Sequence, residues 1–137
     1  MTVLTKVVLD TNILISAIVF GGKPRKVLES VIKGHIQLVL TEKIIEEMRE
    51  VLDGKKFQSP KEITDLIIHE LEALAEIVKP KHKITVIEKD PEDNKVLECA
   101  HESQADYIVS GDVFLLELEI FEGSKIVIAE EILEILD

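Results

Sequence analysis

The sequence lacks the features of an extracellular, zinc-binding or membrane-embedded protein. Its 137 residues include a single cysteine, Cys99, which cannot form a disulfide within the chain. The cysteine and the four histidines do not show the spacing of a zinc site. No apolar run approaches the length of a membrane span, and the N-terminus lacks the basic and then apolar pattern of a signal peptide. We therefore expect a cytoplasmic protein without a membrane partner.

Linkers, internal repeats and low-complexity segments are also missing from the sequence. The chain is 46% hydrophobic and 31% charged, which is typical of a globular protein rather than a disordered one. Its length suits one domain and is sufficient to bury a sizeable core. We predict a single domain that spans residues 1–137.

A surplus of basic residues, the usual sign of a nucleic-acid-binding protein, is missing as well. The formal net charge is −11. The charges are unevenly distributed: residues 1–87 carry 13 basic and 12 acidic side chains, whereas residues 88–137 carry 3 basic and 15 acidic ones. An anionic partner is therefore expected at the first part of the chain and a cation near the second.

Short apolar runs alternate with helical patterns along the chain. The runs are rich in β-branched residues and predict buried strands at 7–9, 37–40, 107–109 and 125–129. Apolar periodicity, caps and breaks predict helices at 11–20, 24–34, 41–52, 59–78, 90–103 and 129–137. This alternation predicts an α/β fold in which a parallel sheet is covered by helices on both faces.

Two aspartates follow two of the predicted strands. Asp10 comes directly after strand 7–9, and Asp112 comes shortly after strand 107–109. In parallel α/β sheets, ligand sites form beyond the carboxyl ends of the strands, where the strand order reverses. If these two strands are neighbours, the carboxylates converge there.

Helical geometry selects two further acids. In helix 41–52, Glu46 and Glu50 point away from the apolar stripe, whereas Glu47 lies on its flank and can face a cleft. In the helix that begins near Asp93, this aspartate lies on the apolar face, and Glu98 is expected to point away from it. A carboxylate on the inward face at the start of a helix suggests a ligand role.

Each acid also has an ordinary structural explanation. Asp10 is suited to capping a helix, Asp112 to a turn, and Glu47 to a solvated helix flank. Asp90 is interpreted as an N-cap before Pro91, which makes Asp93 part of a capping box. Together, however, like charges about 4 Å apart cost about 4 kcal/mol per pair at an effective dielectric of 20. A cation offsets this cost, and oxygen ligands without histidine or cysteine favour Mg²⁺ or Mn²⁺.

The segments that carry these acids resemble the PIN-domain family of small metal-dependent ribonucleases. The matching segments are "VVLDTNILISAIVFGGKPRKVLE", "LTEKIIEEMREVL", "DPEDNKVLECA" and "ADYIVSGDVFLL", in this order over most of the chain. The resemblance implies a three-layer α/β/α sandwich with a five-stranded parallel sheet in the order 3-2-1-4-5. The residues indicate four strands clearly, and the remaining one would come from 36–40 or 84–87.

The resemblance also assigns roles to particular residues. The implied catalytic and metal-binding acids are Asp10, Glu47, Asp93 and Asp112, which would hold one or two Mg²⁺ or Mn²⁺ ions. The implied polar supports are Thr11, Asn12, Ser16 and Ser110. Many relatives have another aspartate where this chain has Phe114. This difference weakens the case for a tightly held second ion.

The hypothesis that follows is an endoribonuclease that hydrolyses RNA phosphodiester bonds with water activated by a divalent cation. Asp10, Asp93 and Asp112 would hold one ion, and Glu47 would orient the attacking water or help to hold a second ion. Contacts to RNA phosphates are expected from the basic residues Lys23, Arg25, Lys26 and Arg49. The alternative for the stretch "GGKPRK" is a solvated loop. The family further implies single-stranded RNA as substrate, an antitoxin protein as partner, and a homodimer or higher homo-oligomer.

Two alternatives belong to other functional classes. A PIN scaffold with little or no activity would act as an RNA- or protein-binding module, an interpretation that Phe114 keeps open. A phospho-accepting receiver-type domain would need adjacent acids after the first strand, where this chain has Thr11 and Asn12, and the stretch "LVLTEK" contains no acceptor aspartate. The aliphatic faces of helix 59–78 are interpreted as core or as a self-association surface.

Overall fold

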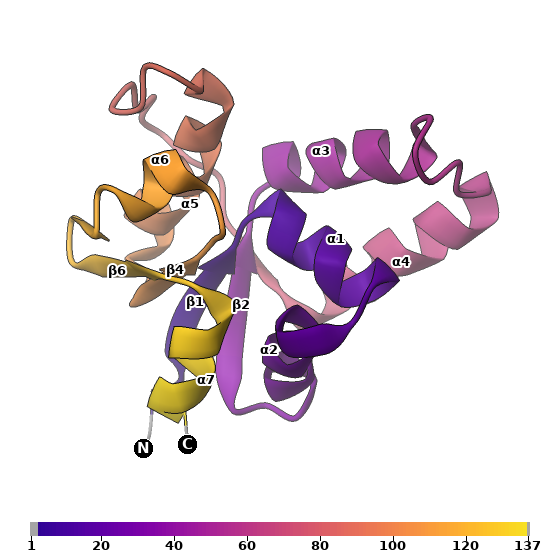
Figure 1. Cartoon of the computed structure of the whole chain (residues 1–137), viewed down its shortest axis with the longest axis horizontal. Coiled ribbons are helices and arrows are strands. Elements are labelled where there is room, and N and C mark those ends of the chain that lie inside the picture. Colours follow the sequence, from indigo (N-terminus) through magenta and orange to yellow (C-terminus); the bar gives the residue numbers. More distant parts are fainter. Residues whose placement is uncertain (1–2, 137) are drawn as a thin grey trace.

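A six-stranded sheet forms the centre of the computed structural model, which describes residues 3–136 (Figure 1). The strand order is β3-β2-β1-β4-β6-β5, and all neighbouring strands are parallel except β5 and β6. The strands are β1 (Thr5–Leu9), β2 (Ile36–Leu40), β3 (Glu76–Ile77), β4 (Tyr107–Val109), β5 (Ile120–Phe121) and β6 (Ser124–Val127). The five parallel strands confirm the predicted order 3-2-1-4-5, and β5 adds a short antiparallel edge.

Helices cover both faces of the sheet. They are α1 (Thr11–Val19), α2 (Gly22–Ile32), α3 (Glu42–Asp53), α4 (Lys61–Leu74), the 3₁₀ turn η1 (Pro91–Asp93), α5 (Asn94–Ser103), α6 (Val113–Leu116) and α7 (Ala129–Leu136). The α5 helix packs on β1, β2 and β4, whereas α2 packs on β2 and against α7 on the other face (Figure 1). None of the helices within residues 3–136 is long and apolar enough to cross a membrane.

The central strands are apolar along their length because both of their faces are covered. Val7, Val8 and Leu9 of β1 are fully buried, as are Leu38 and Val39 of β2. The α5 helix covers β1 and β2 on one face, and α2, against which α1 packs, covers β2 on the other. The rigid centre of the sheet therefore fixes the positions at which β1 and β4 end.

Two predicted segments are wrong in detail. Residues 84–87 form no strand; backbone N–H groups at both ends of this segment donate to side chains of α5 instead of pairing with the sheet. The remaining parallel strand is instead β3, at one edge of the sheet. Its residues were predicted to belong to helix 59–78, but the helix in this region, α4, already ends at Leu74. Ala75 adopts an extended conformation, and Ile77 pairs with Leu40 of β2. At these residues, hydrogen bonding to β2 is more favourable than continuing the α4 helix.

Smaller differences concern the helix ends. The α2 helix begins at Gly22 rather than Pro24, because Gly21 and Gly22 adopt positive φ angles of 88° and 65° that make a tight turn after α1. As predicted, Gly34 follows the end of α2, with a φ angle of 79°. Thr41 caps α3 by accepting a hydrogen bond from the Ile44 N–H.

Candidate functional site

An acidic cleft lies where the strand order reverses. The first strand, β1, has β2 on one side and β4 on the other, so the chain connections on its two sides run in opposite directions. Asp10 follows β1, and its N–H donates to Val109 O of β4 over 3.2 Å. The cleft has a volume of about 180 Å³, and its lining includes all four acids that the sequence singled out: Asp10, Glu47, Asp93 and Asp112.

Ser110 connects the two aspartates that follow the strands. Its hydroxyl donates to Asp10 Oδ2 and accepts a hydrogen bond from the Asp112 N–H over 2.9 Å. Asp10 is only 6% exposed and Ser110 is fully buried. Burial raises the pKa of Asp10, while the hydrogen bonds from Ser110 and Ile13 oppose that increase. Ser110 therefore fixes the spacing of the two acids and stabilises the charge of the more buried one.

Both of these aspartates also cap helices, as the ordinary explanation predicted for Asp10, whereas a turn was predicted for Asp112. Asp10 Oδ1 accepts from the Ile13 N–H over 2.8 Å at the start of α1. Asp112 Oδ1 accepts from the Phe114 N–H over 2.8 Å at the start of α6. Capping fixes each carboxylate rotamer, so these bonds hold the acids in the cleft rather than away from it.

Three carboxylates approach one another closely enough to share a cation. One oxygen atom each of Asp90, Asp93 and Asp112 lies within 4.8 Å of the other two. Burial, followed by the neighbouring Asp112, raises the pKa of Asp93 to about 7. Asp93 is therefore about half protonated at pH 7 when no cation offsets these charges.

Unsatisfied polar atoms mark the same cleft. Among residues 3–136, the buried side-chain oxygens without a hydrogen-bond partner are Asp93 Oδ2 and Thr11 Oγ1, and both residues line the cleft. Buried polar atoms are nearly always paired in folded proteins, so unpaired ones require an explanation. A hard divalent cation with oxygen ligands fits this donor set, and the residues that would hold it are Asp90, Asp93 and Asp112.

Asp90 is a member of the cluster that sequence reasoning missed. The sequence indicated an N-cap, but the Asp90 side chain makes no capping hydrogen bond to η1 or α5. Only its backbone oxygen participates, by accepting from the Asp93 N–H over 3.0 Å. Because Pro91 starts a 3₁₀ turn rather than a regular α-helix, the Asp90 carboxylate is directed to the cluster instead.

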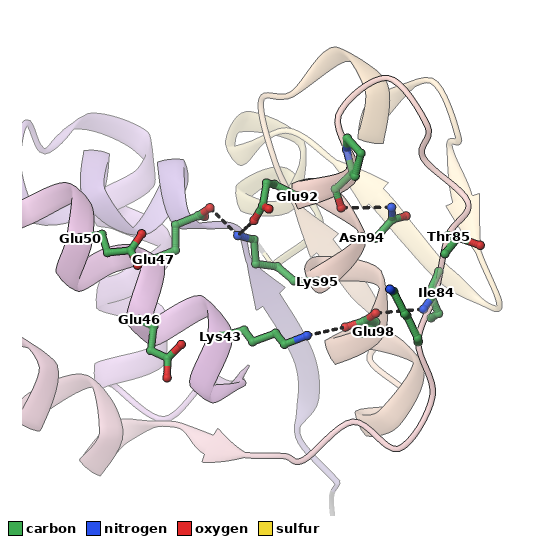
Figure 2. A pocket seen from close by; sticks show the side chains of 12 residues that line it. Lys43, Glu46, Glu47, Glu50, Ile84, Thr85, Glu92, Asn94, Lys95 and Glu98 are labelled. Carbon is green, nitrogen blue, oxygen red and sulfur yellow. Dashed lines mark hydrogen bonds and ion pairs between the residues drawn. The ribbon is translucent and has the colours of Figure 1, made fainter.

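Glu47 lies in the cleft but belongs to an ion pair. Lys95 Nζ of α5 contacts Glu47 Oε2 of α3 and, over 2.9 Å, Glu92 Oε2 (Figure 2). The Lys95 side chain is 11% exposed and that of Glu47 30%. Burial lowers the pKa of Lys95, but its hydrogen bonds to the two glutamates outweigh this effect and raise that pKa above its ordinary value. Lys95 therefore places a fixed positive charge at the rim of the cleft.

The remaining predicted supports lie at different depths. Thr11 is 5% exposed, while Asn12 is exposed, and both line the cleft. Ser16 lies half-buried further along α1 and does not line it. Thr11 and Ser110 are therefore placed to act on the carboxylates directly.

The basic residues expected to bind RNA do not line the cleft. Lys23 pairs with Glu130 over 3.2 Å, and Arg49 pairs with Asp65. Arg25 donates to the backbone oxygens of Ala17 and Ile18, over 2.9 and 3.0 Å, and so holds the end of α1. Lys26 is exposed. The basic stretch that includes Arg25 thus has a structural task in joining α1 to α2.

Sequence reasoning also placed Glu98 incorrectly and did not consider Asn94. Glu98 was expected to point outward, but it is 7% exposed and accepts a hydrogen bond from the Ile84 N–H over 2.9 Å. Asn94 is 6% exposed and exchanges hydrogen bonds with Ile87 over 2.9 and 2.8 Å. The sequence did contain a signal for these two positions. Asn94 and Glu98 are four residues apart, so they lie on the same helix face and form a polar stripe that can bind a neighbouring segment.

Comparisons with known proteins agree with this architecture. No curated protein sequence matches the chain significantly. The structure is similar to a chain in the crystal structure of VapBC2 from Rickettsia felis bound to a DNA fragment from their promoter. The TM-score is 0.64 at 15% sequence identity, and the match covers 89% of this chain and 97% of the other, which shows a shared fold. The sequence profile of the PIN domain matches residues 6–113, so the chain belongs to the PIN-domain family of nucleases.

Proposed function

We propose that the protein is a Mg²⁺- or Mn²⁺-dependent endoribonuclease that hydrolyses phosphodiester bonds in single-stranded RNA. The observation that carries this proposal is the approach of Asp90, Asp93 and Asp112, together with a buried oxygen of Asp93 that has no hydrogen-bond partner. Such an arrangement is costly for a protein that has only to fold, because like charges repel and an unpaired buried oxygen loses its hydration.

Asp90, Asp93 and Asp112 would hold the ion, and the buried Asp10 would add negative charge beside them. When bound, a divalent cation activates the attacking water and offsets charge on the phosphate. Ser110 keeps Asp10 and Asp112 in register by bonding to both. The Thr11 hydroxyl, which has no protein partner, is available to donate to a carboxylate or to the substrate.

Glu47 and Lys95 act at the rim of the cleft in this proposal. Lys95 holds one oxygen of Glu47, which leaves the other oxygen to orient a water molecule or to contact a second ion. Because Lys95 already neutralises Glu47, and because Phe114 replaces a further acid, we propose one tightly held ion. A second ion would have to compete with the lysine.

A role as the toxin of a toxin–antitoxin pair is the finer proposal. The similarity in fold to a chain of the VapBC2 structure supports it. An antitoxin partner and a homo-oligomer belong to this proposal. It is tested by co-purifying the protein with the product of a neighbouring small gene. A stable complex is expected, and a chain that stays alone and does not arrest growth when produced would contradict the toxin role.

Family membership argues against the receiver-type alternative, but a PIN scaffold that only binds remains the competing proposal. Calorimetry with Mg²⁺ and Mn²⁺, followed by cleavage of a mixed single-stranded RNA with and without chelator, separates the two. The variants are Asp10→Asn, which retains a good helix cap, and Asp65→Asn, a control of equal charge change on α4.

We expect metal-dependent cleavage in the wild type and in Asp65→Asn, and its loss in Asp10→Asn. Metal binding without cleavage across many RNAs would favour the binding scaffold. Absence of metal binding in the wild type would remove the proposed site altogether.

A further inference from the structure

Residues 78–90 contain no helix or strand, and three side chains of α5 bond to the backbone of this segment. Asn94, Glu98 and Glu102 accept hydrogen bonds from the N–H groups of Ile87, Ile84 and Lys81, over 2.9, 2.9 and 3.0 Å. The three acceptors are four residues apart and so lie on one face of the helix. Because the backbone is turned toward α5, the side chains of the basic segment, residues 79–83, are left exposed.

The basic segment has the sequence Lys-Pro-Lys-His-Lys and presents its charges without counter-ions. Within residues 3–136, Lys79, Lys81 and Lys83 form no ion pair. Lys43 of α3 faces them; it reaches Glu98 only at 4.0 Å, and its side chain is 72% exposed. These four lysines line one hollow of about 500 Å³, whose acidic lining residues are Glu42 and Glu98.

This basic hollow is continuous with the acidic cleft. A hollow of about 480 Å³ lies between α3 and residues 83–85, and Figure 2 shows its lining side chains. It shares Lys43, Lys83 and Glu98 with the basic hollow, and Glu47, Glu92 and Lys95 with the acidic cleft. Its other charged lining residues are Glu46 and Glu50 of α3. A single path therefore leads from the clustered carboxylates, past Lys95, to the unpaired lysines.

We propose that a single strand of RNA lies along this path, with its scissile phosphate at the acidic cleft and its neighbouring phosphates on Lys43, Lys79, Lys81 and Lys83. The inference rests on the proposed nuclease function and names the route of its substrate. The acidic end of the path suits a cation and the basic end suits a polyanion. The hollow between them has a mixed lining, in which Lys43, Lys83 and Lys95 are the groups that can contact phosphates. No phenylalanine, tyrosine or tryptophan among the described residues lines the path, so binding is expected to be mainly to phosphates and not to particular bases.

The test measures binding rather than cleavage. A fluorescein-labelled oligouridine of twelve nucleotides is titrated with the protein in the presence of chelator, and its anisotropy is followed at several NaCl concentrations. The variant carries Lys79→Gln, Lys81→Gln and Lys83→Gln. The matched control carries Lys33→Gln, Lys61→Gln and Lys125→Gln, three exposed lysines outside the path.

We expect the path variant to lose at least about tenfold in affinity near 100 mM salt, and its slope of log affinity against log salt to become shallower by about 2, because three phosphate contacts each contribute about 0.7. The control should bind within about twofold of the wild type, and all three proteins should melt at similar temperatures. Equal losses in the variant and the control would overturn the proposal, because only bulk charge would then matter.

Two competitors test the identity of the occupant. The competitors are an RNA duplex of matched length and a polyglutamate peptide, each compared with unlabelled single-stranded RNA. If either competitor displaces the oligouridine as effectively as the single-stranded RNA does, the assignment to one RNA strand is overturned. Because chelator is present throughout, loss of binding in the path variant supports the route even if cleavage is never observed. Conversely, cleavage that proceeds normally in the path variant, with unchanged binding, would reject the route and leave the nuclease function intact.

Discussion

The raised pKa of Asp93 predicts an unusual dependence of stability on pH in the metal-free protein. The folded-state pKa is about 7, compared with 3.8 for the unperturbed carboxyl. Between these values the folded state holds a proton that the unfolded state has released. Stability from this group is therefore fully present below pH 3.8 and is lost as the pH rises through about 7.

The magnitude follows from the size of that difference. A change from 3.8 to about 7 corresponds to at most about 4 kcal/mol. Asp93 is half-buried, so solvent screening reduces this figure, and we take about 2 kcal/mol as the working value. Asp93→Asn cannot ionise and escapes the loss. The variant should therefore be more stable than the wild type by about 2 kcal/mol at pH 8, and by almost nothing near pH 4.

The assay is urea unfolding of both proteins in chelator at intervals from pH 4 to pH 8. The difference between the two proteins isolates Asp93, because all other titrating groups are shared. Saturating Mg²⁺ should reverse the order at pH 8, since a ligand at 100 times its dissociation constant stabilises the wild type by about 2.7 kcal/mol. A difference that stays constant across the pH range would refute the reasoning, as would stabilisation of the variant by Mg²⁺ to the same extent.

Three further predictions concern the surroundings of the cluster. Ser110→Ala removes the donor to the buried Asp10 and should destabilise the protein by about 1–3 kcal/mol in urea unfolding at pH 7; no change would show that Asp10 needs no donor. Asn94→Ala should cost about 2 kcal/mol, whereas Asn12→Ala at an exposed position should cost less than about 0.5, and equal costs would contradict the role of Asn94 in fastening residue 87. Lys95→Met frees two glutamates, so calorimetry should show a second, weaker Mn²⁺ binding event that the wild type lacks; one event in both proteins would argue against a lysine that excludes the second ion.

The centre of the fold was predictable because its signals are strong. The continuous apolar residues of β1 and β4 identify strands buried on both faces, and the alternation with helices fixes their parallel arrangement. The two-residue strands β3 and β5 leave no periodic pattern, so no reading of the sequence alone detects them. Residues 84–87 contain β-branched side chains and favour an extended chain, but α5 rather than a strand receives their hydrogen bonds.

The candidate site was predictable only in part, for a similar reason. Asp10 and Asp112 follow strands, and Asp93 lies on an inward helix face, so simple rules place all three. The participation of Asp90 and Lys95 in the site depends on tertiary geometry. A 3₁₀ turn directs the Asp90 carboxylate to the cluster, and Glu47 of α3 holds the Lys95 side chain. From the sequence alone, Asp90 is explained equally well as a helix cap and Lys95 as a solvated helix residue, without any functional site.

The measurement that tests the central claim most directly is the rate at which an end-labelled single-stranded RNA is cleaved as Mn²⁺ is added. The comparison is between the wild type, Asp112→Asn and Asp65→Asn. Asparagine retains the α6 cap but removes one charge from the cluster. The account predicts cleavage that rises to saturation with Mn²⁺ in the wild type and in Asp65→Asn, and cleavage at least about a hundredfold slower in Asp112→Asn. Cleavage that needs no divalent cation, or that is equally fast in Asp112→Asn, would contradict it.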